Sequence, residues 1–169
     1  VGALIVRDGL DITPLMLGGG QEMSRRAGTE NVAGIAGFGA AAEAASRDLA
    51  DGAWESVAEI RNILEEALEA QCPGIILTAK GHARLPGTVH MIAPGWKGET
   101  QVMAMDLAGF AVSSGSACSS GKVKASRVLA AMGYDREHAA SALRISIGPG
   151  IGREDVLRFA EIYARGWRR

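Results

Sequence analysis

The sequence predicts a mixed α/β fold built from amphipathic helices and short strands. The clearest helical period covers residues 53–71, where four apolar positions share one face: Val57, Ile60, Leu64 and Leu68. The clearest strand pattern covers residues 141–148, where apolar and polar side chains alternate. A second helix is predicted over residues 153–167, with acidic residues in its first turn and arginines in its last.

Composition limits the function classes. The chain has 169 residues, 47% of them hydrophobic and 22% charged, which suffices for one domain or one domain plus a piece of another. A net charge of -1 does not show the excess of positive charge that is typical of proteins that bind nucleic acid or an anionic membrane. No apolar run approaches the roughly 18 to 20 residues of a spanning helix. We therefore expect neither nucleic acid nor a membrane among the partners.

The two cysteines, Cys72 and Cys118, lie in unlike surroundings and do not suggest a disulfide framework. With no secretory signal at its start, the chain fits the reducing cytoplasm. It opens inside an apolar run without an initiator methionine, so we expect a truncated or processed chain.

Two apolar runs, residues 2–7 and 10–17, flank the turn signal Asp8-Gly9 and predict a strand pair. A polar loop with two arginines follows and ends near Thr29, before the Ala- and Gly-rich helix predicted over 32–46. A helix N-terminus with a hydroxyl and a guanidinium nearby suits a phosphate, while an ordinary helix cap is the alternative. The glycines predict that this helix is held by tight packing against a neighbour.

A polar break over residues 47–52 predicts a domain boundary within it. The helix over 53–71 ends at Pro73-Gly74, which leaves Cys72 in a position that packing explains better than chemistry. Short apolar runs at 75–77 and 88–93 predict strands.

Isolated histidines carry little weight in this sequence. His82, His90 and His138 share no metal-like spacing with Cys118, so we predict no metal site.

The segment 113–122, Ser-Ser-Gly-Ser-Ala-Cys-Ser-Ser-Gly-Lys, places Cys118 among small and polar residues. Such surroundings predict an accessible and reactive thiol, although a linker that happens to contain a cysteine is the alternative. The loop is predicted to join a strand at 111–113 to a helix at 125–132. A helix that begins at residue 98 precedes it, with one expected apolar face: Met103, Leu107 and Phe110.

Arg144 lies on the alternating strand, on the face opposite its apolar side chains: Leu143, Ile145 and Ile147. A planar guanidinium on a rigid element suits bidentate binding of a carboxylate, although an exposed structural ion pair is the commoner use.

Five motifs in this order and spacing resemble those of group I cysteine desulfurases, which belong to the class V aminotransferases of fold-type I. They are Gly-Gly-Gly-Gln-Glu, Arg-Arg-Ala-Gly-Thr-Glu-Asn, Arg-Leu-Pro-Gly-Thr, Ser-Ser-Gly-Ser-Ala-Cys-Ser-Ser-Gly and Leu-Arg-Ile-Ser-Ile-Gly. The cysteine motif is the most specific of the five, and the resemblance covers essentially the whole chain.

The resemblance implies a pyridoxal-phosphate enzyme that converts L-cysteine to L-alanine. In it, Cys118 takes the sulfur as a persulfide, and Arg144 binds the substrate α-carboxylate. It also implies that Thr29 gives its hydroxyl to the cofactor phosphate of the neighbouring subunit in a homodimer. A sulfur-acceptor or iron–sulfur scaffold protein is the implied partner. By resemblance, residues 1–48 are the end of a large cofactor-binding domain and residues 49–169 are the small domain.

The sequence also departs from the family. The Schiff-base lysine of the family lies in a Ser-x-His-Lys run upstream of the first strand here, and no lysine of this chain has that context. We therefore expect this chain alone to be inactive. Gly87 stands where the family usually has asparagine. Two alternatives stay open: a non-catalytic small domain that docks sulfur acceptors or scaffolds, and a selenocysteine lyase of the same fold.

Overall fold

The computed structural model describes residues 1–115 and 126–168. These residues fall into two compact units, Val1–Asp51 and Gly52–Arg169, each of which has its own architecture.

The first unit contains a short 3-10 helix, η1 (Gln21–Ser24), and one long helix, α1 (Val32–Ala50). The predicted strand pair at 2–7 and 10–17 is wrong, because both runs are irregular here. A strand needs a paired neighbour and a surface to bury its apolar side chains. Neither is present within this unit, and the side chain of Ile5 is 97% exposed.

Helix α1 ends four residues later than predicted, at Ala50. The expected tight packing of this Gly-rich helix is also not found, since no residue of Val1–Asp51 is buried. Its N-cap is Asn31, whose side chain accepts a hydrogen bond of 3.0 Å from the backbone N–H of Gly34. Thr29 is therefore not the N-cap of this helix.

The second unit combines helices with a small antiparallel sheet, which confirms the predicted class. Its elements are α2 (Ala53–Gln71), β1 (Ile76–Leu77), β2 (Thr88–Ile92), α3 (Gly98–Leu107), β3 (Ser113–Ser114), α4 (Arg127–Ala131), α5 (Arg136–Ala140), β4 (Ala142–Ser146) and α6 (Arg153–Trp167). The strand order is β1-β2-β4-β3, and every neighbouring pair is antiparallel.

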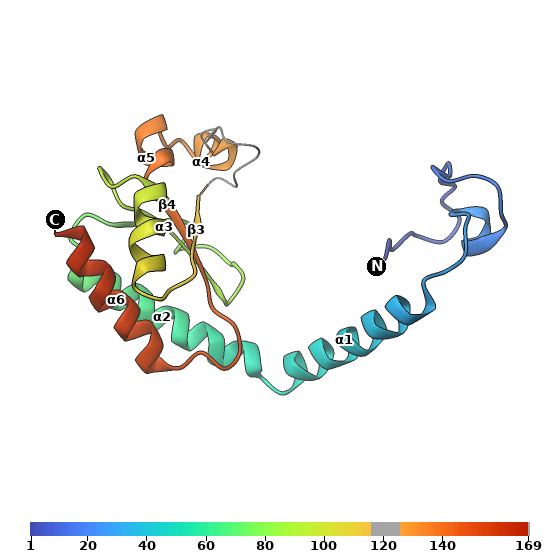
Figure 1. Cartoon of the computed structure of the whole chain (residues 1–169), viewed down its shortest axis with the longest axis horizontal. Coiled ribbons are helices and arrows are strands. Elements are labelled where there is room, and N and C mark those ends of the chain that lie inside the picture. The colour runs from blue at the N-terminus through green and yellow to red at the C-terminus, as the bar shows by residue number, and fades with distance from the viewer. Residues whose placement is uncertain (116–125, 169) are drawn as a thin grey trace. The chain divides into compact units, whose positions relative to one another are not determined.

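The core of this unit lies between the sheet and helices α2, α3 and α6, and Figure 1 shows α2 and α6 side by side. Both predicted helices begin and end where the sequence placed them, at 53–71 and 153–167. The predicted inner residues of α6 are buried: Val156, Phe159, Ala160 and Tyr163. Cys72 is fully buried in this core, as its structural role requires. A smaller cluster around Ile92 and Leu129 packs α4 and α5 against the sheet.

Of the three residues predicted to face inward from α3, only Phe110, which lies just after the helix, packs against the core. Met103 and Leu107 are 66% and 88% exposed, whereas Gln101 and Met105 are buried. Gln101 is turned inward because its amide nitrogen donates to the carbonyl oxygens of Trp96 (2.6 Å) and Ser141 (2.9 Å). Apolar spacing alone could not identify an inner face fixed by a polar side chain.

None of the described helices combines the length and the apolar character that crossing a membrane requires.

Candidate functional site

Arg144 lies on β4, between two neighbouring strands. Its register partners are His90 on β2 and Ser113 on β3. The alternation predicted for β4 is confirmed, because Leu143 and Ile145 are buried while Arg144 is exposed. Among the residues that the structure describes, none forms a salt bridge with Arg144.

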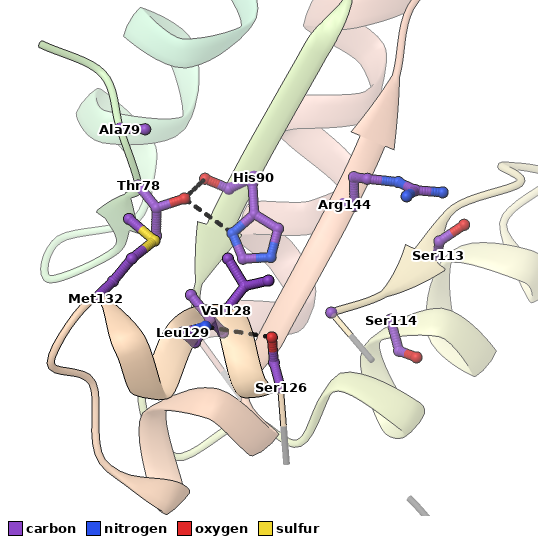
Figure 2. A pocket seen from close by; sticks show the side chains of 11 residues that line it. Thr78, Ala79, His90, Ser113, Ser114, Ser126, Val128, Leu129, Met132 and Arg144 are labelled. Atoms are coloured by element: carbon purple, nitrogen blue, oxygen red, sulfur yellow. Dashed lines mark hydrogen bonds between the residues drawn. The ribbon is translucent and has the colours of Figure 1, made fainter. Parts of the chain in front are cut away.

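A cavity of about 580 Å³ lies over this face of the sheet, a volume typical of small-molecule sites. Thr78, which follows β1, and polar side chains of β2, β3 and β4 meet apolar side chains of α4 across it (Figure 2). Its described lining is Thr78, Ala79, His90, Ser113, Ser114, Gly115, Ser126, Val128, Leu129, Met132 and Arg144. The combination of one cation, several hydroxyls and an apolar wall suits a small polar ligand that carries an anionic group.

Cys118 lies outside the described residues, in the segment 116–125. The two described residues that flank this segment, Gly115 and Ser126, both line the cavity. Gly115 is fixed by a hydrogen bond of 2.9 Å from its backbone N–H to the carbonyl of Ala142. Ser126 is the N-cap of α4, and its side chain accepts from the backbone N–H of Leu129. The segment that carries Cys118 therefore leaves and re-enters the described fold at this cavity.

His90 is a site residue that the sequence did not identify. Its Nδ1 lies 2.9 Å from Thr78 Oγ1, and burial together with the positive charge of Arg144 lowers the pKa of its imidazole. The signal available was the alternation of residues 88–92, which places His90 on the polar face. The alternation shows only on which face of its strand His90 lies. The pairing of β2 with β4 shows that Arg144 is its neighbour.

Thr29 lies in the first unit, in the exposed loop before α1. No described residue hydrogen-bonds to its hydroxyl, and the first turn of α1 carries no acidic side chain. Nearby, Arg26 Nη1 donates to the carbonyl of Gly28 at 3.2 Å. A hydroxyl close to a helix N-terminus can bind a phosphate, and the neighbouring carboxylate is that of Glu30. Thr29 and Arg144 belong to different units, so the structure describes two separate parts of the predicted site.

No described lysine lines the cavity. Lys80 forms a salt bridge of 2.6 Å with Glu69, and Lys97 occupies the residue before α3. Lys122 and Lys124 lie outside the described residues. Across the described ranges, no group of three or more His, Cys, Asp or Glu side chains is placed to hold a metal ion.

Residues 1–159 match the family model of class-V aminotransferases. A cysteine desulfurase of Klebsiella pneumoniae is 41% identical over 147 residues, which are 87% of this chain and 36% of that protein. Cysteine desulfurase IscS of Dictyoglomus turgidum is 38% identical over 156 residues, 92% of this chain and 39% of that protein. The X-ray structure of a NifS-like protein from Rickettsia africae superposes with a TM-score of 0.82 at 32% identity, covering 95% of this chain and 41% of that one. This chain thus spans well under half the length of these relatives.

Proposed function

Because the chain belongs to the class-V aminotransferase family, we propose that it is the C-terminal part of a cysteine desulfurase dependent on pyridoxal phosphate. In this proposal, residues 1–48 complete the large cofactor-binding domain and residues 49–169 form the small domain. One observation carries the proposal: Arg144, which forms no salt bridge with any described residue, shares a cavity with both described residues that flank the Cys118 segment.

Arg144 would bind the α-carboxylate of L-cysteine. A bidentate contact between a guanidinium and a carboxylate fixes orientation as well as supplying free energy. The rigid strand β4 places this contact on the cavity wall, so the rest of the substrate extends toward the α4 side.

Cys118 would be the nucleophile. As a thiolate, its Sγ forms a bond to the sulfur of L-cysteine while the bond from that sulfur to carbon breaks, so that sulfur stays on Cys118 as a persulfide. L-alanine then leaves, after its carbon has taken a proton. The persulfide sulfur is passed to an acceptor or iron–sulfur scaffold protein.

Pyridoxal phosphate, when bound, supplies the electron sink that this cleavage needs. Of the residues in this chain, Thr29 fits its phosphate, and we assign that hydroxyl to the neighbouring subunit of a homodimer. The lysine that holds the cofactor covalently is assigned to the part of the enzyme beyond this chain. A cytoplasmic location agrees with a thiol that must stay reduced.

The two cysteines provide a matched test. In the complete enzyme, Cys118→Ser should reduce alanine formation by about 10³-fold or more, because a hydroxyl cannot accept sulfane sulfur. Cys72→Ala should leave the rate nearly unchanged, since that thiol is fully buried in the core of the second unit. Alanine released from L-cysteine is the measurement, and a fully active Cys118→Ser enzyme would exclude the proposal.

The 169-residue chain permits a second measurement. Burial raises the pKa of the Cys72 thiol, with a smaller opposing effect from Arg168, so little thiolate forms there at neutral pH. Limited iodoacetamide labelling followed by mass spectrometry should find Cys118 modified well before Cys72. Preferential labelling of Cys72 would contradict the proposed role of the Cys118 segment.

A further inference from the structure

His90 and Arg144 face the same cavity from neighbouring strands. They are direct register partners in the antiparallel pair of β2 and β4, and both line the cavity. Side chains at such positions have Cβ atoms roughly 4.5–5.5 Å apart on one face of the sheet. An anionic group that binds to the guanidinium of Arg144 therefore lies within electrostatic range of the imidazole of His90.

These two side chains are the ionisable groups among the described residues that line the cavity. β3, α4 and the segment that follows β1 contribute hydroxyls and apolar carbon to it, and no described carboxylate. Arg127 of α4 is exposed and does not line the cavity. Charged side chains of the segments next to β2 are paired with each other: Glu65 with Arg84, and Lys80 with Glu69. The described charge that acts on His90 is thus that of Arg144, and together with burial it lowers the pKa of the imidazole.

Thr78 can accommodate this imidazole in its neutral and in its charged form. Thr78 Oγ1 lies 2.9 Å from Nδ1 of His90 and 3.2 Å from the carbonyl oxygen of the same residue. With a neutral ring, the single hydroxyl hydrogen can be donated to either of these two acceptors. A protonated ring keeps both contacts as hydrogen bonds, because Nδ1–H donates to Oγ1 while the hydroxyl donates to the carbonyl. His90 can therefore gain a proton without losing a partner.

A bound carboxylate changes the electrostatic environment that keeps His90 neutral. Its negative charge offsets the positive charge of Arg144, and a nearby anion raises the pKa of an imidazole. We propose that His90 takes up one proton from solvent when the carboxylate of the substrate binds to Arg144, and that it then forms the second cation of the carboxylate site. This inference rests on the carboxylate role proposed for Arg144.

Proton uptake makes the binding of a carboxylate dependent on pH. In the free chain, the pKa of His90 lies below 6.5, and in the complex it is higher. Between these two values the complex holds more protons than the free chain, so affinity should rise as the pH falls through this range and be constant above and below it. By linkage, a pKa rise of about one unit corresponds to about tenfold tighter binding at the acidic end.

L-lactate and L-lactamide are a matched pair of probes for this coupling. L-lactate has a carboxylate and no amino group, and carboxyl groups with a pKa of about 4 stay ionised above pH 5.5. L-lactamide has the same carbon skeleton without the charge. NMR titration of the 169-residue chain measures the pKa of His90 with and without each compound. L-lactate should raise this pKa by about one unit, whereas L-lactamide should leave it unchanged.

The guanidinium resonance of Arg144, followed in the same samples, reports carboxylate binding separately. If L-lactate shifts Arg144 and leaves the pKa of His90 unchanged, proton uptake is excluded while the proposed function stands. If L-lactate shifts neither group, the carboxylate role of Arg144 fails, and the role of His90 fails with it. An equal pKa rise with L-lactamide would also overturn the inference, because that compound adds no negative charge.

A variant pair tests the pH dependence of affinity. The unsubstituted chain should bind L-lactate more tightly at pH 5.5 than at pH 7.5, by up to about tenfold. His90→Phe should show no such difference, whereas His82→Phe, outside the cavity, should keep it. A difference that persists in His90→Phe would assign the proton to another group and overturn the inference. The NMR titration of the unsubstituted chain decides the question if the variant does not fold.

Discussion

Arg84 and Arg144 differ in their ion-pair partners among the described residues of this unit. Arg84 forms a bidentate pair with the carboxylate of Glu65, at 2.6 and 2.7 Å, and also donates to the carbonyl of Thr88. The side chain of Glu65 is only 2% exposed, so this pair is shielded from solvent. Replacing only one of the two residues by a neutral one would leave the other as a buried charge without a partner. Arg84 therefore holds the 84–88 segment against α2, whereas none of the described residues forms a salt bridge with Arg144.

Gly87, at the end of that segment, is required by a close approach of two backbones. Its carbonyl accepts a hydrogen bond of 2.8 Å from the N–H of Ile147. A Cβ at position 87 would overlap the carbonyl oxygen of Ile147 and crowd Val57. The polar side chain expected by resemblance at this position therefore has no space beside the backbone of Ile147, which follows β4.

Gly87→Ala should lower the free energy of unfolding by about 1–3 kcal/mol, the usual cost of inserting an atom into a packed site. Gly81→Ala is the matched control, because an added Cβ there meets no atom within 4 Å. Its effect should stay within about 0.5 kcal/mol. Urea denaturation of both variants measures the difference, and equal stabilities would show that the backbones are farther apart than described.

At the scale of elements, a buried polar network joins α6, α3 and the start of β4. The hydroxyl of Tyr163 donates to Gln101 Oε1 at 2.7 Å, and the amide nitrogen of Gln101 donates to the carbonyl of Ser141 just before β4. Tyr163 also lies against the rings of Trp96 and Phe159, with centroids 5.0 and 5.8 Å away. Helix α3 is oriented by these bonds, which is why its apolar Met103 and Leu107 face outward.

Tyr163→Phe should destabilise the second unit by about 1–3 kcal/mol, because it leaves the buried oxygen of Gln101 without its donor. Tyr134→Phe is the control, since no described residue hydrogen-bonds to the Tyr134 hydroxyl, and it should cost much less. Denaturant unfolding followed by circular dichroism provides the comparison. A loss no larger than that of the control would mean that the network contributes little to stability.

At the scale of the whole molecule, the two units differ in how far they bury their apolar side chains. The second unit buries a continuous core, from Val57 on α2 to Ala164 on α6. The first unit buries none, and apolar residues such as Leu15 and Leu17 are 99% and 80% exposed within it. Burial is the main favourable contribution to folding, so the resistance of the chain to unfolding resides in the second unit.

The stability of that unit should fall as the pH is lowered below 6.5, the ordinary pKa of histidine. Burial and Arg144 lower the pKa of His90 in the folded state, so between that lower pKa and 6.5 the unfolded chain binds more protons than the folded one. The contribution of His90 is complete above 6.5 and is lost on acidification. The melting temperature at pH 7.5 and 5.5 should differ less in His90→Gln than in the unsubstituted chain. An unchanged difference would assign the effect to other groups.

The sequence by itself determined the elements whose patterns are local. The periods of 53–71 and 153–167 defined α2 and α6 to the residue, and alternation placed Arg144 on the open face of β4. These predictions succeeded because helix and strand periodicities reflect burial on one face of a single segment. The reasons for singling out Cys118, Arg144 and Thr29 were likewise local, and their roles remain proposals.

Only the tertiary structure decided what depends on partners distant in the sequence. It placed His90 beside Arg144, paired Arg84 with Glu65, turned Gln101 inward and required glycine at position 87. It also showed that the apolar runs at 2–7 and 10–17 do not pair within their unit. Each of these outcomes depends on a hydrogen-bond partner or a backbone supplied by another segment. The physical reason is that a polar side chain is buried only where such a partner exists, and no local pattern records that partner.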